Sequence, residues 1–140
     1  MTAPETIIVT DAGFGPDTFA GRFAGAEDFA ATGAAALDLP SDTDPAVVAD
    51  LARTVELVRI DFPGFADGRG FSIARALRRA GYTGRLRARG HVLADQYAMA
   101  RRSGFDEVEI DAALAARQPE DQWRTRADWQ AHDYRSRLAG

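Results

Sequence analysis

The chain has 140 residues, of which 46% are hydrophobic and 27% charged, as expected for one globular domain that buries a core. It contains no cysteine, which excludes disulfides, cysteine-ligated iron–sulfur clusters, zinc–thiolate sites and a catalytic thiol. All 17 basic residues are arginine, which excludes a Schiff-base lysine and the lysine-dependent phosphate loop.

The net charge of −4 is distributed unevenly along the sequence. The formal charge is −8 for residues 1–50, −1 for 51–68, +8 for 69–102 and −3 for 103–140. The positive block holds nine arginines and one acid, Asp95. Such a block either faces an anion or pairs internally with the acidic lead-in, and internal pairing is the default expectation.

No apolar run reaches the roughly 18 residues of a membrane span, and the first ten residues lack the basic start of a signal peptide. We therefore expect a cytoplasmic protein whose partners include neither a membrane nor a nucleic acid.

The acidic lead-in, residues 1–45, begins with a β-branched stretch at Thr6–Thr10 that predicts a strand. Gly13 and Gly15 follow it like half of a dinucleotide fingerprint, but Pro16 and the missing third glycine favour a simple turn. Residues 18–36 fit either one loose helix or a covering loop.

A short edge strand is predicted at residues 37–39, ended by Pro40. A cap of Ser, Asp and Thr residues followed by Pro45 then predicts a helix over 45–53.

Residues 55–110 predict a βαβαβ unit. The first strand, residues 55–60, is apolar on both faces, which is typical of a parallel strand covered by helices on both sides. The second strand has arginine at every second position, 85, 87 and 89, an edge-like or half-exposed pattern with three guanidinium groups on one side. The other elements are helices ended by Gly81 and Gly104 and a strand at 107–110.

The tail is read as a polar segment, 111–118, and a C-terminal helix, 119–138, begun by Pro119. Trp129 and His132 fall off its apolar stripe, so this helix has a second adhesive side for the domain or another subunit, and a homo-oligomer is possible.

Together these elements predict a single α/β domain over residues 1–140, with a mainly parallel sheet of about four or five strands built from short βα units. The layout expected is flavodoxin-like or a partial (β/α) barrel, because a complete barrel needs about 250 residues.

The first candidate for chemistry is the stretch Asp67-Gly68-Arg69-Gly70-Phe71-Ser72, between a predicted parallel strand and a helix. Ligands of α/β sheets bind at this position, glycine amides approach anions closely, and an arginine adds a bidentate fork. The alternative is a tight loop in which Asp67 pairs with Arg69 and Ser72 only caps the helix.

The second candidate is His91, Asp95 and Gln96 at the start of the following helix. His91 and Asp95 are one turn apart, so they share a hydrogen bond, face a ligand, or leave Asp95 to pair with an arginine. Two histidines in the whole chain do not build a metal site by themselves, so no metal is expected.

The sequence resembles the bacterial family catalogued as domain of unknown function 934 over residues 55–110. The resemblance rests on Phe62-Pro63-Gly64-Phe65-Ala66-Asp67-Gly68-Arg69-Gly70-Phe71-Ser72, Gly81-Tyr82-Thr83-Gly84, Val92-Leu93-Ala94-Asp95-Gln96 and Gly104-Phe105-Asp106. Members are usually encoded beside assimilatory sulfite reductase and labelled probable oxidoreductases. The resemblance implies a pathway but no catalytic residues.

The leading hypothesis is an accessory protein of sulfite reduction that docks the reductase, or an anionic cofactor, through an arginine-rich face. The ligand-binding residues it predicts are Asp67, Gly68, Arg69, Gly70, Ser72, Arg85, Arg87 and Gln96. The alternatives are an oxidoreductase using a bound flavin or nicotinamide, with Asp67, Asp95 or His91 as proton donor, and a structural subunit whose arginines only neutralise its acidic lead-in.

Overall fold

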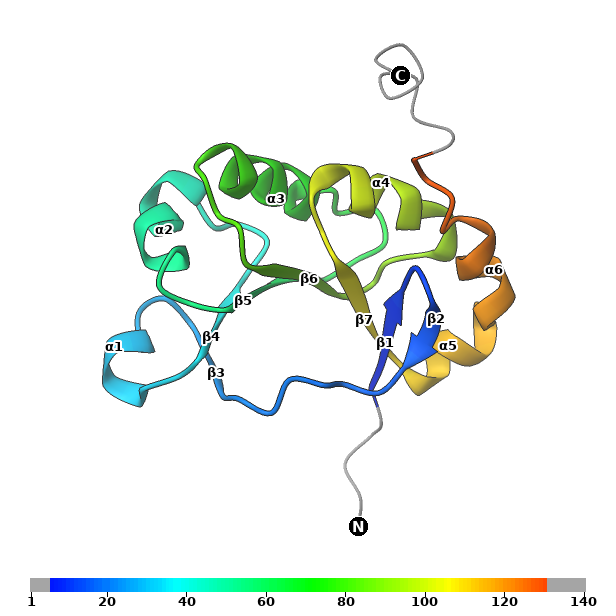
Figure 1. Ribbon diagram of the computed structural model, residues 1–140, viewed down its shortest axis with the longest axis horizontal. Helices are drawn as coiled ribbons and strands as arrows, with labels where there is room; N and C mark the ends of the chain where they lie inside the picture. Colours follow the sequence, from blue (N-terminus) through cyan, green and yellow to red (C-terminus); the bar gives the residue numbers. More distant parts are fainter. Residues whose placement is uncertain (1–5, 131–140) are drawn as a thin grey trace.

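The computed structural model describes residues 6–130, which form an α/β fold around one mixed sheet (Figure 1). The strand order within the described part is β2-β1-β7-β6-β5-β4-β3. The strands are β1 (Thr6–Thr10), β2 (Gly13–Gly15), β3 (Phe23–Ala24), β4 (Ala36–Leu39), β5 (Leu57–Phe62), β6 (Arg85–Gly90) and β7 (Glu107–Asp111). The α-helices are α1 (Phe29–Thr32), α2 (Pro45–Ala52), α3 (Arg69–Arg79), α4 (Tyr97–Ser103), α5 (Ala112–Arg117) and α6 (Glu120–Thr125), and a 3₁₀ turn, η1 (Ala94–Gln96), precedes α4.

Strands β3 to β7 run parallel, whereas β1 pairs antiparallel with β7 and β2 antiparallel with β1. The mainly parallel α/β prediction is therefore confirmed, and the sheet is open. It has more strands than predicted because β2 and β3 are only three and two residues long. Strands this short leave no periodicity in the sequence.

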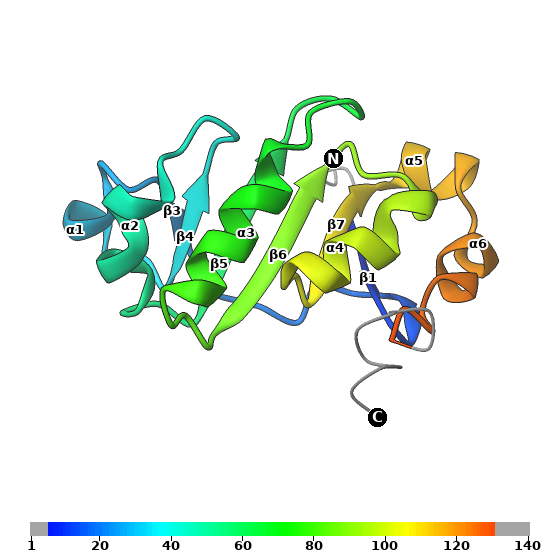
Figure 2. The ribbon, with the colours of Figure 1, turned by 90° about the horizontal axis from the view of Figure 1, so that it is seen from above.

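Helices α2, α3 and α4 cover one face of the sheet (Figures 1 and 2). Val58, Ile60 and Leu86 are fully buried in the core beneath them, together with Ala88 and Val108. Because side chains alternate along a strand, the next residues, Arg59 and Arg87 among them, face the opposite side. The core thus lies between the sheet and a single helical layer.

The opposite face is crossed by residues 16–22, the crossing segment, which joins β2 to β3 below the sheet (Figure 1). The prediction that β5 has helices on both sides is therefore wrong. Its apolar residue on this side, Leu57, is fully buried, but the next residue outward is Arg59, whose side chain pairs with carboxylates. A layer of ion pairs takes the place of a second helical layer. This ionic layer consists of Arg59, Arg85 and Arg87 with Asp17, Asp38, Glu107 and Glu109.

The edge strand predicted at residues 37–39 and the edge option for residues 85–89 are both wrong, because each strand has a neighbour on either side. The half-exposed option for residues 85–89 agrees with β6, where the Arg85 and Arg89 side chains are 31% and 47% exposed. Strand β4 lies between β3 and β5, and β6 lies between β5 and β7. The alternation of arginine with apolar residues in β6 arises because one face packs under helices and the other joins the ionic layer. Residues 18–36 form the covering loop of the two options, with β3 and α1 within it.

The residues predicted to begin α2 and to end α3 and α4 do so in the structure. Asp44 caps α2 by accepting a hydrogen bond from the Ala46 amide at 3.0 Å, with Pro45 as the first helical residue. Gly81 and Gly104 follow α3 and α4 with φ of +101° and +115°, where only glycine is unstrained. The polar segment 111–118 is instead the helix α5, capped by the Asp111 carboxylate at 2.7 Å from the Leu114 amide.

The C-terminal helix is shorter than expected in the described part, because α6 ends at Thr125. Trp129 then docks on the domain itself, with its indole nitrogen 3.3 Å from Asp11 Oδ2. His132 and the rest of the predicted helix lie outside the described residues. Within residues 6–130, no helix has both the length and the apolar character that crossing a membrane requires.

Candidate functional site

The Gly-rich loop follows β5 and starts α3, as the sequence predicted, but it carries its own anion. Asp67 accepts hydrogen bonds from the Arg69 amide at 3.1 Å and from Arg69 Nε and Nη2 at 3.0 and 2.7 Å. These bonds from the Arg69 side chain and amide hold the pKa of Asp67 well below its usual range. The carboxylate therefore occupies the place at the helix N-terminus that an external anion would take.

The loop glycines have different roles. A Cβ atom on Gly70 would lie 2.5 Å from the Phe62 ring, so this glycine allows α3 to pack closely against β5. Gly68 is the N-cap residue of α3. Ser72, which the alternative reading made the cap, is exposed in the first turns of the helix. The other part of that alternative hypothesis, the pairing of Asp67 with Arg69, agrees with the geometry.

Arg69 also reaches across to the loop after β4. Its Nη2 atom lies 2.9 Å from Ser41 Oγ, while 60% of the side chain is exposed. It lies at one end of an open groove of about 530 Å³, here called the Arg69 groove. The groove is lined by Ser41, Asp42, Thr43, Pro45, Arg69, Ser72, Ile73, Ala76 and Arg79.

Arg85 and Arg87, predicted to share a ligand with Arg69, do not meet it. Arg85 is opposite Leu57 at the amino end of β5, whereas Arg69 follows the carboxyl end of that strand. A six-residue strand spans roughly 16 Å, so the two lie at opposite ends of the sheet. The single arginine-rich face expected from the sequence is thus divided between two places.

Arg87 is fully buried in the ionic layer. Its guanidinium group donates to Asp17, Glu107 and Glu109. Burial by itself would lower the pKa of Arg87, but its hydrogen bonds to these carboxylates and their negative charge outweigh burial, and the pKa is raised. Arg87 is therefore a structural cation with no surface available for an external ligand.

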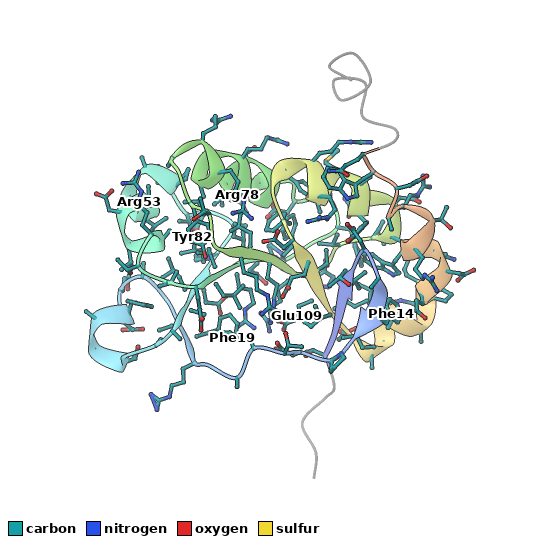
Figure 3. The ribbon with its side chains drawn as sticks, in the orientation of Figure 1. Phe14, Phe19, Arg53, Arg78, Tyr82 and Glu109 are labelled. Carbon is teal, nitrogen blue, oxygen red and sulfur yellow. The ribbon has the colours of Figure 1, made fainter. Side chains whose placement is uncertain are left out.

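Neighbouring charges extend the layer in both directions. Arg85 donates to Glu107 at 2.7 Å and to Thr18 of the crossing segment at 3.1 Å. Arg59 bridges Asp38 and Glu109, and its guanidinium carbon lies 3.7 Å from the centre of the Phe23 ring. Glu109 and Phe19 lie on this lower side of the sheet in Figure 3. The arginine block does pair internally, but its partners in this layer are mainly acids of β7. Of the described residues of the acidic lead-in, which was the expected partner, only Asp17 pairs with the block in this layer, through Arg87.

The segment after β6 does not bring its candidate residues together. His91 Nδ1 lies 3.1 Å from the Phe62 carbonyl oxygen, whereas Asp95 pairs with Arg126 at 2.9 Å. Gln96 caps the turn by accepting from the Leu93 amide and donates to the Phe65 carbonyl oxygen. Pairing of Asp95 with an arginine, one of the expected options, is the arrangement found.

His91 lines a second hollow, of about 310 Å³, at the carboxyl ends of β5, β6 and β7. This hollow, the His91 pocket, is lined by Thr6, Asp61, Pro63, Phe65, Arg89, Gly90, His91, Glu109, Ile110, Asp111, Leu114 and Arg117. Sequence reasoning missed Asp61 and Arg117 as site residues. The available signal for Asp61 was its position near the carboxyl end of a predicted parallel strand, where such sheets bind ligands. Arg117 lies in the last turn of α5 and had no such signal.

The described residues offer little for a metal or a dinucleotide. No group of three or more His, Asp or Glu side chains among them is placed to hold a metal ion. Gly13 and Gly15 form a strand of a hairpin, and the Phe14 amide between them donates to Glu120 at 2.9 Å. Since protein carboxylates also occupy the other Gly-rich loop, neither stretch fits the pyrophosphate of a flavin or nicotinamide dinucleotide.

Comparison with known proteins bears on the family alone. No curated protein and no solved structure gives a significant match to this chain. The family model described as "Bacterial protein of unknown function (DUF934)" matches residues 36–138, which hold strands β4 to β7 and the helical layer but not β1 to β3. The chain is therefore a member of the DUF934 family.

Proposed function

We propose that this chain is an accessory protein of assimilatory sulfite reduction that docks the reductase through the Arg69 groove. The pathway is what family membership implies, since members are usually encoded beside the reductase. The observation that supports docking is the shape and charge of the groove, which has an arginine at each end and an apolar floor. The proposal puts the protein in the cytoplasm with its partner.

The arginines at the two ends are Arg69 and Arg79, ten residues apart on α3. A rise of 1.5 Å per residue separates them by about 15 Å. Ile73 and Ala76 lie between them on the same helical face. A groove of this length fits a protein segment with acidic ends and an apolar centre better than it fits a single small anion.

Arg79 is the most informative of these residues. It is exposed, and its side chain has no ion pair or hydrogen bond with any residue that the structure describes. Arg69, in contrast, holds the loop to Ser41 and Asp67, so replacing it would alter the fold as well as the charge. A change at Arg79 therefore tests binding without disturbing an internal contact.

The experiment measures binding of sulfite reductase to the immobilised chain over a series of salt concentrations. We expect Arg79→Gln to weaken binding several-fold and to reduce its salt dependence, because one charge contact is lost. Arg124→Gln is the matched control, since Arg124 is exposed and lies on α6, outside the groove. Equal binding by wild type and Arg79→Gln, or no binding by wild type, would rule out docking through this groove.

The same samples address the oxidoreductase alternative. An absorbance spectrum of the purified chain and thermal melts with flavins and nicotinamides detect a bound cofactor, because ligands that bind the folded state raise the melting temperature. A chromophore or a nucleotide-specific shift would favour the enzyme over the accessory protein.

A further inference from the structure

We infer that the His91 pocket is a second binding site, separate from the Arg69 groove, for a small organic acid with one carboxylate and a short apolar or aromatic body. The pocket lies where β5, β6 and β7 end together, the position at which open parallel sheets bind ligands. Its volume of about 310 Å³ suits a molecule of that size and is small for a dinucleotide.

The geometry around His91 fixes which ring nitrogen faces a ligand. A carbonyl oxygen only accepts hydrogen bonds, so Nδ1 carries the proton and donates to the Phe62 carbonyl at 3.1 Å. Nε2 is then the ring atom left for a ligand, and it donates to a carboxylate oxygen when it too carries a proton. Phe65 packs edge-on against the ring, with centroids 5.0 Å apart, and holds its orientation.

Two arginines supply the positive charge. Arg89 is 47% exposed and has only long contacts with acids, 3.6 Å to Asp61 and 3.4 Å to Glu109. Glu109 already accepts from Arg59 and Arg87, so it does not satisfy Arg89. The side chain of Arg117, in the last turn of α5, makes no ion pair or hydrogen bond within the described part of the chain. Both guanidinium groups keep donors for a carboxylate.

The remaining lining limits the ligand further. Asp61, Glu109 and Asp111 place three carboxylates around the pocket, and these repel a ligand with several negative charges. Phe65 and Leu114 add apolar surface that a bare inorganic ion does not use. A monocarboxylate with an apolar body satisfies both conditions.

Benzoate is the probe we would use, with inorganic phosphate and benzyl alcohol as its charged-only and neutral counterparts. Binding is followed through the imidazole Cε1 proton resonance of His91 in proton NMR spectra. The chain has only two histidines, so the variant His91→Gln identifies the resonance by its loss. We expect benzoate to bind in the millimolar range and phosphate and benzyl alcohol at least about tenfold more weakly.

The decisive variant is Arg117→Gln, which removes a guanidinium group without breaking a described contact. It should weaken benzoate binding about tenfold, as loss of one charge-assisted contact does, whereas Arg79→Gln should leave it unchanged. Equal affinity of wild type and Arg117→Gln, no response to benzoate, or phosphate binding as tight as benzoate would overturn the inference. Reductase docking is tested by Arg79→Gln, which leaves the His91 pocket intact, so either conclusion can fail alone.

Discussion

At the scale of single residues, the arginines separate into structural and available groups. Arg87 has no exposed surface, and its three acid partners come from β7 and the crossing segment. Its partners lie 20 to 70 residues away in the sequence, so no local pattern identifies them. Arg79 belongs to the same positive block but contacts no described acid. From composition alone, both residues were expected either to pair internally or to face an anion.

Replacing Arg87 tests the structural group. Arg87→Gln leaves Glu107 and Glu109 partly uncompensated in a buried layer, so we expect the free energy of unfolding to fall by about 3 kcal/mol. Urea unfolding measures this change. The control, Arg79→Gln, should stay within about 0.5 kcal/mol of wild type. A comparable small change for Arg87→Gln would contradict its structural role.

Gly70 tests the close packing of α3 on β5. In Gly70→Ala the new methyl group meets the Phe62 ring, and the overpacking exceeds the gain in helix propensity of about 1 kcal/mol. We expect a net loss of about 1–2 kcal/mol in the free energy of unfolding. Gly64→Ala is the matched control, because nothing lies within 4 Å of its Cβ position. Similar stabilities of the two variants would show that the contact does not constrain the helix.

At the scale of elements, local sequence signals predicted the helix ends correctly, whereas features that depend on contacts between distant residues were not predicted. Helix α2 was predicted from its cap and Pro45, and the ends of α3 and α4 from Gly81 and Gly104. Each of these signals acts within one turn of helix. Pairing between distant strands determines the ionic layer, the crossing segment and the position of β6. Such pairing cannot be recognised from a single sequence. The same reason explains why Arg117 was missed.

The crossing segment should be sensitive to acid through Asp17. A hydrogen bond from Arg87 is the main cause that lowers the pKa of Asp17 below its usual 3.8. A lowered pKa means that the ionised carboxylate stabilises the fold above pH 3.8 and that this contribution is lost as the pH falls through the folded-state pKa. Asp17→Asn should therefore destabilise the protein at neutral pH and much less in acid.

Urea unfolding of wild type and Asp17→Asn at neutral pH and at acidic pH measures the difference. Asp50→Asn is the control, because its side chain is 98% exposed. A difference for Asp17→Asn that is the same at both pH values would show that its ionisation is not coupled to folding.

At the scale of the whole molecule, the sheet has one apolar face under helices and one ionic face under a crossing segment. The acidic lead-in contributes β1 to β4, so it is part of the sheet as well as a source of charge. The α/β class, the parallel core and the position of the Gly-rich loop were predictable from the sequence. The division of the arginines between the two faces could be recognised only from the three-dimensional structure.

Alkaline stability tests the two buried tyrosines of the core, Tyr82 and Tyr97. Burial raises the pKa of Tyr82 from 10.0 to about 12, and burial with a hydrogen bond to Asp11 raises that of Tyr97. A raised pKa stabilises the fold below pH 10 and the contribution is lost as the pH rises toward 12. The urea midpoint should therefore fall over this range, and less steeply in Tyr82→Phe. A flat midpoint would contradict the burial of these hydroxyl groups.

The most direct test of the proposed function is to add unlabelled sulfite reductase to the ¹⁵N-labelled chain and follow its amide resonances. Docking through the Arg69 groove predicts that intensity is lost first at Ser41, Thr43 and along α3, while amides beside His91 persist. Loss centred on the ionic face or on the His91 pocket, or no loss at all, would contradict the assignment of the groove as the docking site.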